Sequence, residues 1–291
     1  MSWILLTVIQ ALVEAISNIY DRYVLKNRVK TFETLIIFWG IFSLIMFCTP
    51  AILTNSITVE TPVILLGFAS GLLYVLAMYF YYQAVNRAEV DRIIPVLSLN
   101  PIFILLGATI FFQEFHNLNQ YIGIVLIIFG ILIDSFDRQH HKFIDRKAII
   151  FMAAAALFFA AKSLLAKSLS LGEISPLNIL FWIGIGGFIF SAPFIIKNRK
   201  KVPRTPREIV EHCLAGSLSV ATSLLYTTAI MIGPAALVAF LQRINVFFVF
   251  IISQIIDLKH PQVLREKFVK KAFLQKLFGV MIILIGSFFL I

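Results

Sequence analysis

Charged side chains inside long apolar segments are the residues of this chain best suited to chemistry. Glu14 lies in the middle of the first such segment, and Asn18 follows one helical turn later on the same face. A charge at the centre of a bilayer costs about 2.5–3.5 kcal/mol, so a compensating role is expected. Glu14 is our candidate for proton coupling or for contact with a cationic group of a substrate. The alternative is a structural ion pair or a hydrogen bond between helices.

Arg243 is the second candidate, and it lies within a later apolar segment between Gln242 and Asn245. Its planar guanidinium stays charged and fits a carboxylate or a phosphate, which predicts an anchor for an anionic group. The alternatives are an ion pair with Glu14 that only locks the protein together, or extension of the side chain toward the membrane surface. In a combined hypothesis, the pair forms when the site is empty and the substrate competes for Arg243.

Further candidates for substrate binding are one lysine, two amides and several aromatic rings. Lys162 either contacts substrate or extends to the surface. Asn100 and Asn245 either bind substrate or join neighbouring helices. The complete candidate set is Glu14, Asn18, Trp39, Tyr74, Tyr79, Asn100, Lys162, Trp182, Tyr226, Gln242, Arg243 and Asn245.

The composition requires a lipid environment for these segments. Apolar residues make up 60% of the chain and the mean hydropathy is +0.93, whereas soluble domains average about 45–50% apolar residues. A membrane helix needs about 20 apolar residues, and ten such spans are predicted. They are residues 3–23, 32–53, 62–86, 91–112, 120–133, 147–169, 176–196, 209–232, 234–256 and 273–291.

The two halves of the chain repeat each other. At an offset of 145 residues Gly71 aligns with Gly216, and Asn100 aligns with Asn245. Five spans in each copy place the second copy upside down, as in secondary transporters that bind substrate between inverted repeats. The predicted fold is therefore an all-α polytopic membrane protein of ten transmembrane helices in two inverted five-helix repeats. The first repeat is 1–137, the second is 146–291, and 138–145 connects them.

The distribution of basic residues predicts the orientation in the membrane. Of 25 lysines and arginines, 22 lie in the loops after odd-numbered spans, and the others are Lys162, Lys167 and Arg243. Basic loops stay in the cytoplasm, so both termini are expected outside, in a bacterial inner (plasma) membrane. Scattered short basic loops do not favour nucleic-acid binding. Neither metalloenzyme nor nucleotide-binding motifs occur, so we expect no enzyme activity, metal or cofactor.

Residues 81–133 resemble the EamA-type unit of the drug/metabolite transporter superfamily. The resemblance rests on Ala84, Val90, Leu97, Asn100-Pro101, Glu114 after Phe111-Phe112, Gln120, Gly123 and Gly130. Ser17 to Tyr23 resembles the end of the first span in this family, and Leu241 to Asn245 resembles a basic motif of one bacterial branch. The second half departs from the pattern, because Val246 stands where the first half has Pro101 and Glu114 has no clean counterpart.

The resemblance implies a transporter of amino-acid-like compounds or other metabolites, often an exporter. The residues themselves favour a small polar metabolite, either a zwitterion or an organic anion, carried by alternating access and driven by a gradient, by exchange or by downhill flow. Expected partners are this metabolite and membrane lipids, and the protein is either a monomer or a homodimer. The alternatives are a flippase for a phosphate-bearing lipid carrier, using Arg243 and Lys162, and a non-transporting membrane scaffold or receptor.

Overall fold

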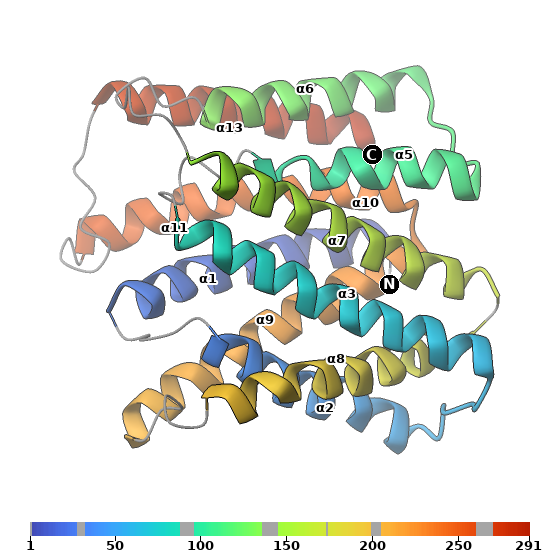
Figure 1. Cartoon of the computed structure of the whole chain (residues 1–291). Coiled ribbons are helices and arrows are strands. Elements are labelled where there is room, and N and C mark those ends of the chain that lie inside the picture. Colours follow the sequence, from blue (N-terminus) through green and yellow to red (C-terminus); the bar gives the residue numbers. More distant parts are fainter. Residues whose placement is uncertain are drawn as a thin grey trace.

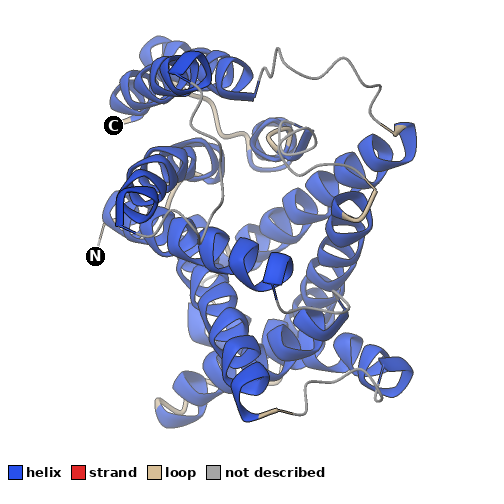
Figure 2. Cartoon of the chain, turned by 90° about the vertical axis from the view of Figure 1, so that its left-hand side faces the viewer, coloured by secondary structure: helices blue, strands red, loops and turns tan. Residues whose placement is uncertain are grey.

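The computed structural model of the chain describes residues 2–27, 33–87, 96–135, 145–172, 174–198, 205–259 and 270–291, and all regular structure in these ranges is helical (Figure 2). The elements are α1 (Trp3–Asn27), α2 (Glu33–Leu53), α3 (Thr61–Val85), α5 (Asn100–Phe112), α6 (Leu118–Ser135), α7 (Arg146–Ser170), α8 (Pro176–Asn198), α9 (Pro206–Ile232), α10 (Ala235–Leu241), η1 (Gln242–Ile244), α11 (Asn245–Lys259) and α13 (Lys270–Leu290). The start of the predicted fourth span, Val90, most of the connecting segment and much of the basic-loop sequence lie outside the described residues.

The described helices have the length and composition of membrane spans. Seven are long and apolar enough to cross a bilayer, and Asn100–Phe112, Leu118–Ile133 and Leu277–Leu290 are shorter apolar helices. The predicted all-helical membrane protein is confirmed. Both Lys162 and Lys167 lie inside α7 rather than in a loop.

Local sequence signals explain where several helices begin. Prolines stand in the first turn of α3, α5 and α9, where the missing N–H is not needed. The Thr205 hydroxyl accepts a hydrogen bond from the Glu208 N–H at 3.3 Å and caps α9. In the same way, the Asp145 carboxylate accepts from the Lys147 N–H at 3.0 Å and caps α7.

Two predicted spans are interrupted at aligned positions. The ninth span, predicted as one helix, divides into α10 and α11 through the 3₁₀ turn η1. In the fourth span, a turn at Ser98 and Leu99 precedes α5. The aligned residues Asn100 and Asn245 each open the helix that follows. Pro101 in the first turn of α5 accounts for the break in the first half, because proline lacks the N–H that would continue the helix, but the break in the second half occurs without a proline.

Helices from the two halves of the sequence pack against each other. Helices α6 and α13 lie side by side at one edge of the bundle, and α2 lies beside α8 at the other (Figure 1). Between these edges, α3 packs on α7 and α1 packs on α9. The N- and C-terminal ends lie at the same end of the bundle (Figure 1).

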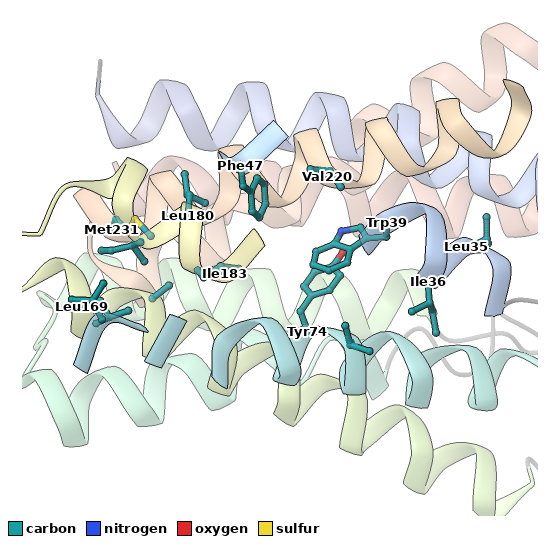
Figure 3. Packing of buried hydrophobic residues seen from close by; sticks show 14 of the residues in the cluster. Leu35, Ile36, Trp39, Phe47, Tyr74, Leu169, Leu180, Ile183, Val220 and Met231 are labelled. Atoms are coloured by element: carbon teal, nitrogen blue, oxygen red, sulfur yellow. The ribbon is translucent and has the colours of Figure 1, made fainter. Parts of the chain in front are cut away.

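The largest group of buried apolar residues lies where α2, α3, α7, α8 and α9 meet. Trp39 and Tyr74 stack there with ring centroids 3.9 Å apart (Figure 3). Phe47, Leu180 and Ile183 are almost completely buried in the same group (Figure 3). This core fixes the helices on which several candidate site residues stand.

Candidate functional site

The Glu14 carboxylate is held by two amides from opposite halves of the chain. Gln10, one turn earlier on α1, donates to Glu14 Oε2 at 3.0 Å. Gln242 of η1 donates to the same oxygen at 2.7 Å. A carboxylate only accepts hydrogen bonds, so both amides must present their NH₂ groups to it. Two of the predicted site residues, Glu14 and Gln242, are thus in direct contact.

Arg243 lies next to this group without forming an ion pair. It lies within electrostatic range of Glu14 and Tyr226, yet the ion pairs of 4.0 Å or less between described residues do not include Arg243. Its Nε is buried and has no hydrogen-bond partner in the described part of the chain. In this conformation Arg243 and Glu14 therefore do not form the ion pair of the combined hypothesis.

Unsatisfied polar atoms gather around these residues. Gln10 Oε1, Arg243 Nε and Asn245 Oδ1 are buried and lack a hydrogen-bond partner among the described residues. Leaving such a group unpaired costs about 1–3 kcal/mol, and buried polar groups in native proteins are usually satisfied. The arrangement can therefore accept a polar molecule that both donates and accepts hydrogen bonds.

Lys162 does not extend to the surface but points into the bundle. Its side chain is 3% exposed, and Nζ donates to Thr227 Oγ1 of α9 at 2.6 Å. A second, longer contact of 3.5 Å reaches Ser223 Oγ, and the ammonium lies 5.7 Å from the centroid of the Tyr74 ring. Tyr74 is also within electrostatic reach of Glu14. Lys162, Tyr74 and Glu14 therefore belong to one polar region.

Other predicted site residues lie apart from this region. The Trp182 indole donates to the Thr58 carbonyl at 3.2 Å and fastens the α2–α3 loop to α8. Tyr79 packs against Phe80 and Phe194. Asn18 is exposed, although it shares a face of α1 with Glu14. These residues are not brought to the Glu14 carboxylate by the contacts described.

The two aligned asparagines have different surroundings. Asn100 donates to the Ala156 carbonyl at 3.1 Å and joins α5 to α7. Asn245 keeps a buried, unpaired Oδ1 two residues after Arg243. The first therefore has the joining role expected for most amides in membrane helices, whereas the second has hydrogen-bonding capacity left for a ligand. Trp39, stacked on Tyr74, is buried beside the polar region.

A second polar group, which the sequence did not predict, joins the halves near the end of the bundle that carries the termini. Lys167 Nζ at the end of α7 donates to the Gly233 carbonyl at 2.7 Å and lies 3.7 Å from Glu114 Oε1. The other carboxylate oxygen, Oε2, accepts from the Ala235 N–H at 2.8 Å at the start of α10. Burial lowers the pKa of the neighbouring His116 imidazole, while the Glu114 charge opposes this shift.

Two further polar residues of α1 were not predicted as site residues. The signal for Gln10 was available, because it precedes Glu14 by one turn in an apolar segment. Asp21 lines a narrow recess with Trp39, Met78 and Tyr82. In the sequence, Asp21 was noted only as part of the segment from Ser17 to Tyr23 near the end of the predicted first span.

Comparisons with known proteins agree with this architecture. A solved structure described as "Crystal structure of protein" superposes with a TM-score of 0.73 at 12% identity and covers 99% of this chain and 96% of that chain. At this identity the similarity establishes the fold alone. An uncharacterized protein of Methanocaldococcus jannaschii is 30% identical over 81 residues, which are 28% of this chain and 59% of that protein.

The family assignment rests on a match that extends over nearly the whole sequence. Residues 1–136 and 146–291 each match the profile described as the EamA-like transporter family. This agrees with the resemblance carried by Ala84, Asn100-Pro101 and Glu114, and with the helices that are long and apolar enough to cross a membrane. The chain belongs to the EamA-like transporter family and is an integral membrane protein of a transporter family.

Proposed function

We propose that this protein is a secondary transporter for a small polar metabolite with an anionic group, bound beside Arg243 and Glu14. The observation that carries the proposal is the buried, unpaired Nε of Arg243 beside the amide-bonded Glu14. A guanidinium in this position offers directed donors for a carboxylate or a phosphate. Glu14, on the other side, suits the ammonium group of a zwitterion.

The packing of the helices supports the proposal that two inverted repeats exchange access between the faces of the membrane. At the offset of the repeats, α1 corresponds to α7 and α3 corresponds to α9. The contact of α3 with α7 therefore has its counterpart in the contact of α9 with α1. Likewise, α5 packs on α7 and α11 packs on α1, while α2–α8 and α6–α13 pair a helix with its own equivalent. Reciprocal contacts of this kind are expected from a two-fold axis in the membrane plane.

The central test is a search for the substrate followed by a flux measurement. Purified protein is screened against a metabolite library for compounds that raise its unfolding temperature, and hits are tested for uptake in proteoliposomes. Arg243→Ala is expected to weaken binding at least about tenfold, because hydrogen bonds to a charged group contribute about 1.5–3 kcal/mol. A compound that stabilises wild type and Arg243→Ala equally removes Arg243 from the site.

Proton coupling at Glu14 is examined in the same vesicles. Glu14→Gln keeps an oxygen that accepts from both amides but cannot lose a proton. We propose that this variant still exchanges substrate across the membrane and no longer accumulates it in response to a pH gradient. Accumulation unchanged from wild type assigns coupling to another group. If wild type carries no hit across the membrane and the two variants change only stability, the scaffold or receptor alternative becomes the better explanation.

We also propose that both termini face the exterior of a bacterial inner membrane, because basic residues gather in the loops at the other face. A reporter that is active only outside the membrane, fused after Ile291, is expected to be active. A matched fusion to a cytoplasmic fluorescent reporter is expected to be dark. An inactive exterior reporter together with a fluorescent cytoplasmic reporter would place the C-terminus in the cytoplasm.

The lipid-carrier flippase has less support. That hypothesis uses Lys162 and Arg243 on one phosphate group. Lys162 instead directs its ammonium to Thr227 and Ser223, and these contacts do not favour a shared phosphate site. Flux of water-soluble hits, rather than activity only with long-chain substrates, distinguishes the transporter from the flippase.

A further inference from the structure

Gln10 and Gln242 bind the same oxygen of Glu14, and this arrangement has a consequence for Arg243. Both side chains are buried, at 0% and 9% exposure, and both donate to Oε2. Gln10 comes from α1 and Gln242 from η1, so the carboxylate is held from two directions. We call Gln10 and Gln242 the amide clamp.

Of the two adjacent residues Gln242 and Arg243 in η1, only Gln242 contacts Glu14 in this structure. In a 3₁₀ turn successive side chains point roughly 120° apart, because there are about three residues per turn. Gln242 and Arg243 are adjacent in η1, so their side chains leave the backbone in different directions. It is Gln242 that makes the contact, at 2.7 Å. Arg243 lies within electrostatic range of Glu14. The two side chains are not among the ion pairs of 4.0 Å or less formed by the described residues.

We propose that the amide clamp is a positioning device, which holds the Glu14 carboxylate away from Arg243 and so keeps the guanidinium available for the anionic group of a substrate. Without the clamp, Glu14 and Arg243 would neutralise each other in a low-dielectric setting, where an ion pair is strong. A substrate would then have to break that pair before it could bind. The assignment of the free guanidinium to a substrate rests on the proposed function, whereas the separation of the two charges does not.

The test uses Gln242→Leu, which removes the donor from the second half while keeping similar volume. Phenylglyoxal modifies unpaired guanidinium groups, and mass spectrometry of the peptide that contains Arg243 gives the rate of modification. We expect this rate to fall about tenfold in Gln242→Leu, because the released carboxylate pairs with the guanidinium. Gln10→Leu, on a different helix, is expected to lower it in the same direction. Gln254→Leu on α11 is the matched control and should react as wild type does.

The decisive comparison adds Glu14→Gln to the Gln242→Leu protein. If the clamp acts through Glu14, the double variant should recover the rate measured for Glu14→Gln alone, since no carboxylate remains to cover Arg243. A merely structural role for Gln242 would leave the double variant as slow as Gln242→Leu. An unchanged rate in both clamp variants, or a loss that persists without Glu14, overturns the inference.

Binding of a substrate hit separates this inference from the proposed function. With the clamp intact, wild type should bind the hit, and Gln242→Leu should bind it about tenfold more weakly, with recovery to the Glu14→Gln level in the double variant. A protein that shows the expected modification rates and transports no hit contradicts the proposed function and leaves the clamp established. A protein that transports a hit with modification rates independent of the clamp contradicts the clamp alone.

Discussion

Lys167→Met is expected to lower the free energy of unfolding by about 3–5 kcal/mol, because removing one partner of a buried ion pair leaves the other charge uncompensated. The Lys167 and Glu114 side chains are only 10% and 15% exposed, and they lie 3.7 Å apart. The substitution also removes the donor that satisfies the Gly233 carbonyl. The measurement is unfolding in mixed micelles of mild detergent and SDS, followed by intrinsic tryptophan fluorescence.

A double-mutant cycle distinguishes the ion pair from general damage at this position. Glu114→Gln keeps an oxygen that accepts from the Ala235 N–H, so it removes the charge while preserving the hydrogen bond to the start of α10. Lys167→Met/Glu114→Gln is expected to be less destabilised than the sum of the single variants, by at least about 1 kcal/mol. Additive effects would show that the two charges do not depend on each other.

The exposed ion pair on α9 supplies the control for this prediction. Arg207 Nε lies 3.2 Å from Glu211 Oε1, but the Arg207 side chain is 71% exposed. Water screens such a pair, and its contribution is about 0–1 kcal/mol. Arg207→Met should therefore change stability by about 0.5 kcal/mol or less. A loss of stability as large as that of Lys167→Met would contradict the view that burial, rather than charge alone, makes the Lys167–Glu114 ion pair stabilising.

The sequence predicted the helices well because apolar length and proline position determine them locally. It did not predict the 3₁₀ turn at Gln242–Ile244, since that segment contains neither proline nor glycine. A break in a helix can follow from contacts made at a distance, and here Gln242 bonds to Glu14, 228 positions away. Such a contact has no signature in the local pattern.

The candidate site was predicted only in part, because local signals identify its charged residues but not the distant partners that position them. Glu14 and Arg243 were found because any charge in an apolar span is costly and needs an explanation. Partners such as Gln10 and Gln242 decide what those charges do, and their geometry arises only when α1 and η1 come together. The separation of Glu14 from Arg243 therefore required the structure. Trp182 illustrates the opposite case. Its aromatic side chain suggested that it lines the substrate site, but its indole donates to the Thr58 carbonyl in the loop between α2 and α3.

Gly71→Ala is expected to destabilise the contact between α3 and α8, although alanine is the better helix former. A Cβ atom at Gly71 would lie 2.5 Å from Gly187 N and 2.8 Å from both Gly186 C and Ile183 O. These are backbone atoms, so no side-chain rotation relieves the overlap. Overpacking costs about 1–3 kcal/mol, and the gain of about 1 kcal/mol in helix propensity offsets part of it. Gly71→Leu should cost more and lower the yield of folded, monodisperse protein.

Two other glycines separate this steric effect from the general effect of replacing glycine. At Gly172 the nearest atom to an added Cβ is the Leu169 carbonyl oxygen at 3.5 Å, an ordinary contact, so Gly172→Ala should be close to neutral. At Gly216, the repeat equivalent of Gly71, the nearest atoms lie at 3.1–3.2 Å on Phe42 and Phe38, which predicts an intermediate loss. If the three alanine variants unfold at the same SDS fraction, the close approach of α3 to the α8 backbone does not hold the bundle together. A graded order of Gly71, Gly216 and Gly172 instead identifies direct backbone contact as the reason that α3 and α8 need glycine where they meet.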